Sequence, residues 1–359
     1  MNDFAAILLK WFRENGRDLP WRGTKDPYAI WLSEIILQQT QVKQGWEYWE
    51  RFMRRWPTVE ALAAASEDEV LREWQGLGYY SRARNLHTAA QQLVTRGGFP
   101  TTIEGIKQLK GVGDYTAAAI GSIAFGLPAA VVDGNVYRVL SRYYGIDTPI
   151  NTTQGKKEFQ ALAQSLIPSL DREGQGVGLY NQAIMDFGAI QCTPSSPNCQ
   201  QCPLLETCTA FREGRVAELP VKQKTLKVKE RHLTYIYIRC QGMTAIHRRP
   251  AGDIWQGLYE PLLIEDEQWT VENWAAQNNC QLSIVNCQLL AKQVKHVLTH
   301  RVLYADFYLL EIGEKPVLPP DYFWIPEADI DNYAVPRLVE ILLSSLTSIT
   351  PLTSITSQK

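Results

Sequence analysis

Four cysteines in one short stretch constrain this chain more than any other feature. They are Cys192, Cys199, Cys202 and Cys208, and their spacing is C-x6-C-x2-C-x5-C. Thiolates at this density bind a soft metal centre, and four of them complete one coordination shell. The stretch QCTPSSPNCQQCPLLETC is proline-rich and has few apolar residues, so burial alone cannot hold it folded. We therefore expect a bound centre to supply the missing folding energy.

The remaining composition fits a soluble protein of two domains. The chain has 359 residues and a formal net charge of −2, so it carries no global basic surface for nucleic acid. No apolar run is long enough to cross a membrane, and the amphipathic start MNDFAAILLKWFREN does not resemble a signal peptide. We expect a cytoplasmic location, where thiols stay reduced, and therefore a metal site with three spare cysteines, Cys240, Cys280 and Cys287.

The chain changes character near its middle. Residues 1–212 have a helical pattern, with a capping box at Ser66 and Glu69 and a buried helix at TAAAIGSIAFG. Residues 213–230 are polar and basic, which is typical of a linker. Residues 231–344 contain the alternating segments LTYIYIRC and RVLYADFYLLEI and predict a mixed α+β domain. The tail, residues 345–359, repeats LTSIT around a proline, and we expect it to be disordered.

Glu34 is the first candidate for acid chemistry. It lies in the predicted helix PYAIWLSEII among apolar residues. Burial raises the pKa of a carboxyl, and a carboxylic acid that keeps its proton near neutral pH can act as a general acid. The alternative is an exposed position on one helical stripe with Gln38 and Gln41, and periodicity alone favours this simpler interpretation.

A second carboxyl follows a glycine turn. Gly111, Val112 and Gly113 form a tight turn before a helix, where backbone N–H groups can approach a phosphate. Further on, an apolar run leads to Asp133 and Asn135, one of which caps the next helix. Capping favours an ionised Asp133, although such caps are more often structural. A protonated Glu34 beside an anionic Asp133 would suit cleavage of a glycosidic bond.

Several motifs in sequence order resemble one family. The segments LKGVGDYTAAAI and VVDGNVYRVLSR resemble the helix-hairpin-helix and catalytic-aspartate region of base-excision DNA glycosylases. The cysteine spacing resembles the [4Fe–4S] loop of the endonuclease III branch. Within that branch LPWR, DPYAIWLSEIILQQTQV, WQGLGYYSRARNLH and YNQAIMDFGA resemble adenine DNA glycosylases of the MutY type, and the likeness covers the whole first domain.

The resemblance implies an all-α helix-hairpin-helix glycosylase domain with an iron–sulfur loop, followed by an α+β Nudix-like C-terminal domain. It implies removal of adenine mispaired with 8-oxoguanine or guanine in double-stranded DNA, after base flipping. Glu34 would protonate adenine and Asp133 would stabilise the sugar cation, with Tyr115 and Asn135 as further catalytic candidates. The residues implied to bind substrate in the first domain are Trp21, Arg22, Gln39, Thr40, Leu77, Tyr79 and Gln182. Gly111, Val112 and Gly113 would contact the DNA backbone.

Tyr115 stands where relatives that also cut the DNA strand have a lysine. That lysine forms a Schiff base with the sugar, and a phenol cannot form an imine. We therefore expect base release with weak or no lyase activity, for which Lys110, close in sequence, is a candidate weak substitute.

The second domain resembles the Nudix-type domain that reads 8-oxoguanine in this family. The family's F-S-H loop corresponds to Leu298, Thr299 and His300, so a hydroxyl is kept and an aromatic ring is lost. Thr299 and His300 are the candidate contacts to the damaged base. His296 and His300 are spaced like metal ligands, but we expect ordinary polar contacts for both.

Three alternatives remain open on sequence grounds. The protein could be an endonuclease III relative with lyase activity, or a non-catalytic iron–sulfur protein that binds DNA or transfers electrons. The four thiolates could also hold zinc. The favoured interpretation is a monomeric, nucleoid-associated adenine DNA glycosylase with a [4Fe–4S] cluster and no membrane contact.

Overall fold

The fold was analysed in a computed structural model, which describes residues 3–168, 176–223, 228–265, 273 and 286–347. The chain divides into two compact units. The first contains residues 1–65 and 84–225, and the second contains residues 66–83 and 226–359. Each unit is described by itself. No helix in the described residues is long and apolar enough to cross a membrane.

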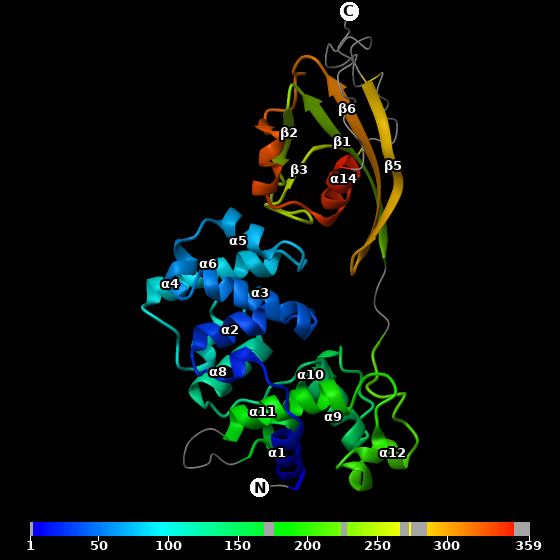
Figure 1. The fold of residues 1–359 in the computed structure, drawn as a ribbon. Coiled ribbons are helices and arrows are strands. Elements are labelled where there is room, and N and C mark those ends of the chain that lie inside the picture. Colours follow the sequence, from blue (N-terminus) through cyan, green and yellow to red (C-terminus); the bar gives the residue numbers. More distant parts are fainter. Residues whose placement is uncertain (1–2, 169–175, 224–227, 266–272, 274–285, 348–359) are drawn as a thin grey trace, which may run out of the picture. The chain divides into compact units, whose positions relative to one another are not determined.

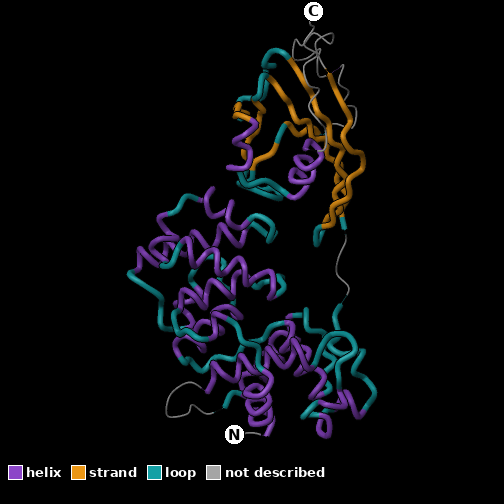
Figure 2. The backbone as a smooth tube through the Cα atoms, viewed as in Figure 1, coloured by secondary structure: helices purple, strands orange, loops and turns teal. Residues whose placement is uncertain are grey.

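Helices make up the regular structure of the first unit, and the strands belong to the second (Figure 2). The helices that precede the glycine turn are α1 (Asp3–Asn15), η1 (Pro20–Arg22), α2 (Pro27–Ile36), α3 (Val42–Arg55), α4 (Val59–Ala64), α6 (Ser81–Arg96) and α7 (Ile103–Lys107). Those that follow it are α8 (Asp114–Phe125), α9 (Gly134–Tyr144), α10 (Thr153–Leu166), α11 (Gly176–Asp186), η2 (Phe187–Gln191), η3 (Cys199–Gln201), η4 (Leu205–Thr207) and α12 (Thr209–Arg212).

One apolar core joins the helices that surround α8 and α9. Its buried members come mainly from α1, α8, α9, α10 and α11, and they include Leu8, Ala119, Leu140, Phe159 and Tyr180. The predicted helix TAAAIGSIAFG is confirmed as α8, and residues 116–122 along it are buried. Removing this apolar surface from water is the main driving force that packs α1, α8 and α9 against α11.

The second unit is a mixed sheet with one helix packed against it. Its strands are β1 (Lys229–Cys240), β2 (Met243–Arg248), β3 (Tyr259–Glu260), β4 (Leu262–Ile264), β5 (Asn286–Val297), β6 (Arg301–Ile312) and β7 (Tyr322–Pro326). The order is β3-β2-β1-β6-β5, with β4 paired to β1 and β7 paired to β2. Strands β1 and β6 are parallel and contain the two predicted alternating segments. Helices η6 (Glu327–Asn332) and α14 (Arg337–Thr347) follow, and α14 packs against β5 and β6 (Figure 1).

Helix α5 (Glu67–Trp74) groups with this sheet although it comes early in the sequence. The predicted capping box at Ser66 and Glu69 is present at its start. Arg248 Nη2 lies 2.7 Å from Glu67 Oε1, and Tyr259 Oη donates a 2.9 Å hydrogen bond to Asp68 Oδ2. The helical segment 66–83 is therefore anchored to the second unit, whereas the sequence pattern had assigned it to the first domain.

Two predicted boundaries also differ from the structure. The start of the expected linker packs against the first unit, because Leu219 is buried and its carbonyl accepts a 3.0 Å hydrogen bond from Arg142 Nε. Helix α14 continues to Thr347, and Leu346 packs in the core of the second unit, so the expected tail does not begin at residue 345. The rest of that tail and Cys280 lie outside the described residues.

Candidate active site

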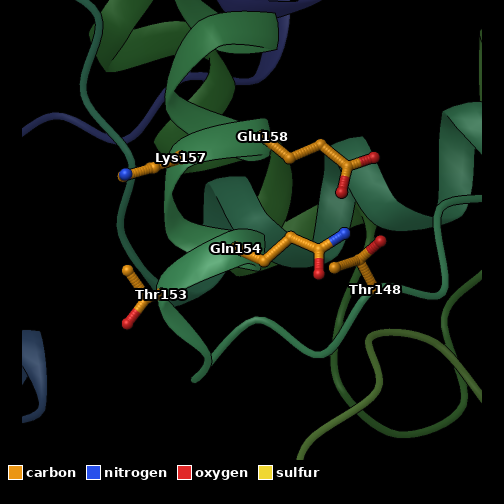
Figure 3. Close-up of a pocket in the computed structure, with 5 residues that line it drawn as sticks. All are labelled: Thr148, Thr153, Gln154, Lys157 and Glu158. Carbon is orange, nitrogen blue, oxygen red and sulfur yellow. The ribbon is translucent and has the colours of Figure 1, made fainter.

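A cavity of about 1080 Å³ in the first unit gathers most of the predicted catalytic and substrate-binding residues. Those that line it are Trp21, Arg22, Glu34, Gln39, Thr40, Tyr115, Asp133, Asn135 and Gln182. They come from η1, α2, the loop after α2, α8, the start of α9 and α11. A second depression lies over α10 between Thr148 and Glu158 (Figure 3), and none of the predicted residues lines it.

Glu34 and Tyr115 meet at the wall of this cavity. Tyr115 Oη donates a 2.7 Å hydrogen bond to Glu34 Oε2 and also lies 3.4 Å from Met185 Sδ. Helix α2 ends at Ile36, so the polar stripe through Gln38 and Gln41 does not continue as a helical face. Glu34 is partly exposed to the cavity that it lines. Its carboxyl group is nevertheless surrounded by protein atoms.

Burial raises the pKa of Glu34 from 4.5 to about 7. The hydrogen bond from Tyr115 lowers this pKa, the nearby Asp133 raises it, and Arg22 lowers it. Burial is the largest of these effects because the charged carboxylate loses its hydration. The pKa of Tyr115 is raised well above its ordinary value by burial and by the neighbouring carboxyls, so its hydroxyl remains a donor at neutral pH.

Asp133 caps helix α9, and it was one of the two residues predicted for this position. Its Oδ1 accepts a 2.8 Å hydrogen bond from the Val136 N–H, and its Oδ2 accepts one of 2.8 Å from Asn135 Nδ2. Burial nevertheless raises the pKa of Asp133, and these two donors offset only part of the effect. The prediction of opposed pKa shifts is therefore wrong, because one buried cavity holds both carboxyl groups. The two carboxyl groups still differ in their hydrogen-bond donors. Asp133 accepts from Asn135 and from a helix N–H, whereas Glu34 accepts from the Tyr115 hydroxyl.

A buried ion-pair cluster at the cavity wall was missed from the sequence. The carboxylate of Asp186 is fully buried and forms ion pairs with both Arg17 and Arg22. Arg22 donates two hydrogen bonds of 2.7 Å to it, one to each carboxylate oxygen. These cations hold the pKa of Asp186 below its ordinary value despite burial. The apolar neighbours of Asp186 in AIMDFGA were a usable signal, because a buried carboxylate requires a cation partner.

The glycine turn has the geometry expected for a backbone anion site. Gly111 has φ of 77°, and a Cβ atom there would lie 2.7 Å from Asn85 Cβ, so only glycine fits. Val112 is buried below the turn, and Gly113 begins α8 with no side-chain cap. The first N–H groups of α8 are therefore available to an oxygen ligand.

Four predicted residues belong to the second unit and do not line the cavity. Leu77 and Tyr79 follow α5, while Thr299 and His300 lie in the turn between β5 and β6. Tyr79 Oη lies 2.6 Å from Thr299 Oγ1, so the two predicted contacts to the opposite base are hydrogen-bonded to each other. Tyr79 and Gln39 both have positive φ, of 47° and 57°. Such backbone strain in non-glycine residues often marks functional positions.

The predicted cluster ligands lie in a loop attached to α9. Cys192, Cys199, Cys202 and Cys208 are free thiols, each partly buried. Burial is the main cause that raises the pKa of Cys202 to about 11, and the other three thiols contribute to the rise, so the four sulfurs share one neighbourhood. No three His, Cys, Asp or Glu side chains in the described ranges form a group that could hold a single metal ion.

Two arginines of α9, one helical turn apart, connect this loop to the helix that Asp133 caps. Arg138 donates to the carbonyl oxygens of Cys192 and Gly188 at 2.7 and 2.6 Å, and to Asn135 Oδ1 at 2.8 Å. Arg142 donates at 2.7 Å to the carbonyl oxygen of Thr193 and contacts Cys192 Sγ at 3.5 Å. The cysteine loop and the helix capped by Asp133 are thus one hydrogen-bonded assembly.

Comparison with known proteins identifies the family. A family of HhH-GPD superfamily base excision DNA repair proteins matches residues 32–169, and a NUDIX domain family matches residues 234–345. An adenine DNA glycosylase of Buchnera aphidicola is 34% identical over 84% of this chain and 84% of its own length. The chain belongs to the adenine DNA glycosylase family. It is therefore a DNA repair enzyme that hydrolyses N-glycosidic bonds.

Two further comparisons cover part of the chain. The human adenine DNA glycosylase is 44% identical over 58% of this chain, which covers 39% of the human protein. The solved structure of a thermostable thymine-DNA glycosylase superposes on 58% of this chain and 95% of its own, with a TM-score of 0.53 and 32% identity. The helix-hairpin-helix and Nudix-like fold classes predicted from the sequence are confirmed.

Proposed function

We propose that this adenine DNA glycosylase acts on adenine opposite 8-oxoguanine or guanine in duplex DNA, and that it releases the base without cutting the strand. The observation that carries the proposal is the 2.7 Å Tyr115–Glu34 hydrogen bond in a cavity shared with Asp133. A carboxyl group with a pKa of about 7 is half protonated at neutral pH, which suits a general acid.

The reaction follows from the positions of the two carboxyl groups. The adenine leaves the base stack and enters the cavity, where Glu34 donates its proton to the ring at N7. The C1′–N9 bond then breaks, and its electron pair leaves with the base. Asp133 stabilises the resulting oxocarbenium-like sugar, as in other glycoside cleavage. Water adds to C1′ and returns a proton to Glu34, which restores the acid.

The absence of a lysine supports base release alone. Tyr115 occupies the first turn of α8, and its hydroxyl is committed to Glu34. A phenol forms no imine with the sugar, so no Schiff base can assist strand cleavage from this position.

The second unit supplies candidate contacts to the base opposite adenine. Thr299 provides a hydroxyl in the β5–β6 turn, and His300 follows it before β6 begins. The hydrogen bond between Thr299 and Tyr79 holds these residues in one polar group that can approach 8-oxoguanine. We propose that this group reads the damaged base.

The four cysteines fit a [4Fe–4S] cluster. Their number, their shared neighbourhood and the soft character of thiolate ligands support this proposal. When bound, the cluster would join the four cysteines and order the loop between them. Arg138 and Arg142 then hold that loop against α9 through its carbonyl oxygens.

A duplex oligonucleotide assay tests the proposed specificity. The substrates place adenine opposite 8-oxoguanine, guanine or thymine, and a fourth duplex places thymine opposite guanine. Each reaction is divided and analysed with and without alkali. Alkali-dependent cleavage at adenine in the first two duplexes is the expected result. Cleavage at thymine, or cleavage without alkali, would contradict the proposal.

A further inference from the structure

The segment that carries Asp133 into the cavity is neither helix nor strand. Residues 127–132 connect α8 to the Asp133 cap, and no β-strand occurs in the described part of the first unit. Ala130 and Val131 are nevertheless buried. Buried peptide groups need hydrogen-bond partners, so something other than a sheet must satisfy this backbone.

Side-chain amides from two helices take the place of a sheet. Asn181 of α11 donates from Nδ2 to the Ala129 carbonyl at 2.8 Å and accepts at Oδ1 from the Val131 N–H at 3.3 Å. On the other side, Gln164 of α10 donates to the Pro128 carbonyl at 2.8 Å and accepts from the Ala130 N–H at 3.1 Å. Each amide therefore offers a donor and an acceptor, as a strand backbone would.

Asn181 is the buried member of this arrangement. It is 1% exposed, and its Nδ2 also donates to Ser122 Oγ of α8 at 2.8 Å. A carbonyl can only accept and an N–H can only donate, so the bonds to Ala129 and Val131 fix which way the amide points. Gln164 holds the same segment from the exposed side, so it can be changed without opening a cavity in the core.

We propose that Asn181 is a positioning residue for the reaction: its amide fixes the path of residues 129–131 and thereby sets where Asp133 enters the cavity. The inference rests on the proposed role of Asp133. Catalytic groups must be held within about 0.5 Å of the productive geometry, and the supporting residues decide whether they are. A misplacement of about 1 Å costs on the order of 100-fold in rate.

The test measures base release and DNA affinity separately. Asn181→Leu keeps the approximate shape without the hydrogen bonds, and Asn181→Asp keeps the shape without the donor. Single-turnover rates are measured on a duplex with adenine opposite 8-oxoguanine. The dissociation constant for the same duplex is measured in an Asp133→Asn background, where no base is released. Rates 10- to 100-fold below wild type are expected, with a nearly unchanged dissociation constant.

A matched control separates positioning from stability. Tyr28 Oη donates a buried 2.7 Å hydrogen bond to the Trp56 carbonyl in the same unit and does not line the cavity. Tyr28→Phe should lower the melting temperature without changing the single-turnover rate. An unchanged rate in both Asn181 variants, measured below their melting temperatures, would overturn the inference.

Gln164→Ala and Asp133→Asn provide two further measurements. If the Asn181 variants do not fold, Gln164→Ala, a surface change, should slow base release at an unchanged melting temperature, and an unaltered rate would count against the inference. If Asp133→Asn alone retains activity, the proposed role of Asp133 fails instead. Loss of activity in Asp133→Asn together with full activity in the Asn181 variants would reject only the positioning role.

Discussion

Replacing Glu34 by glutamine should stabilise the protein at alkaline pH while it abolishes base release. In the folded protein the pKa of Glu34 is about 7, compared with 4.5 for an unperturbed glutamate. The difference is 7 − 4.5, or about 2.5 pH units, and each unit is worth about 1.4 kcal/mol. Keeping Glu34 ionised in the folded state therefore costs about 3 kcal/mol of stability at high pH.

The sign of the pH dependence follows from proton binding. Below pH 4.5 Glu34 is protonated in both states, so it adds no pH dependence. Between pH 4.5 and about 7 the folded protein retains the proton that the unfolded chain has lost, so stability falls as the pH rises. Above about pH 7 both states are ionised and the cost is constant. Glutamine cannot ionise, and its carbonyl oxygen can still accept the hydrogen bond from Tyr115.

The assay is urea unfolding of wild type and Glu34→Gln between pH 4 and pH 8.5, followed by tryptophan fluorescence. We expect the variant to gain up to about 3 kcal/mol at pH 8, and the gain should vanish near pH 4. Glu60→Gln, on the exposed face of α4, controls for the loss of a surface charge. A stability difference that is the same at every pH, or that grows toward acid, would refute the reasoning.

Three further predictions concern Tyr115 and the cysteine loop. Tyr115→Phe removes a hydrogen bond that lowers the pKa of Glu34, so this pKa should rise and the alkaline limb of the single-turnover pH profile should move to higher pH. A limb that moves to lower pH would contradict this. Tyr115→Lys places an amine beside Glu34 and should give strand cleavage without alkali and a borohydride-trapped DNA adduct, whereas failure to trap any adduct would show that position alone is insufficient. Cys202→Ser removes one of the four clustered thiols and should lower bound iron and acid-labile sulfide, which a colorimetric assay of the purified protein measures; unchanged content would exclude Cys202 as a ligand.

Features encoded within one segment were predictable from the sequence. The capping box at Ser66, the buried helix α8, the cap at Asp133 and the strands β1 and β6 each depend on residues close together in the chain. Local pattern and tertiary structure agree at these positions. At Glu34 the apolar neighbours indicated burial and a raised pKa, but helical periodicity favoured an exposed position, so only the tertiary structure distinguishes the two.

Features that depend on distant pairing were not predictable. Asp186 forms an ion pair with Arg17, which lies 169 positions away in the sequence, and no local pattern predicts this pair. The raised pKa of Asp133 has the same origin, because its burial is produced by helices from elsewhere in the chain. Leu219 looked like part of a polar linker, yet its backbone is bound by a buried arginine of α9.

The anchoring of helix α5 bears on how this enzyme can be divided. A truncated gene that stops at Thr225 would remove Arg248, Tyr259 and Glu340, which bond Glu67, Asp68 and Gln75 of the α5 segment. The shortened product would keep its cavity-lining residues but would lose the partners of the segment that carries Leu77 and Tyr79. Removing the Nudix-like half should therefore lower the selectivity for mispaired adenine, even in a fragment that still folds and binds DNA.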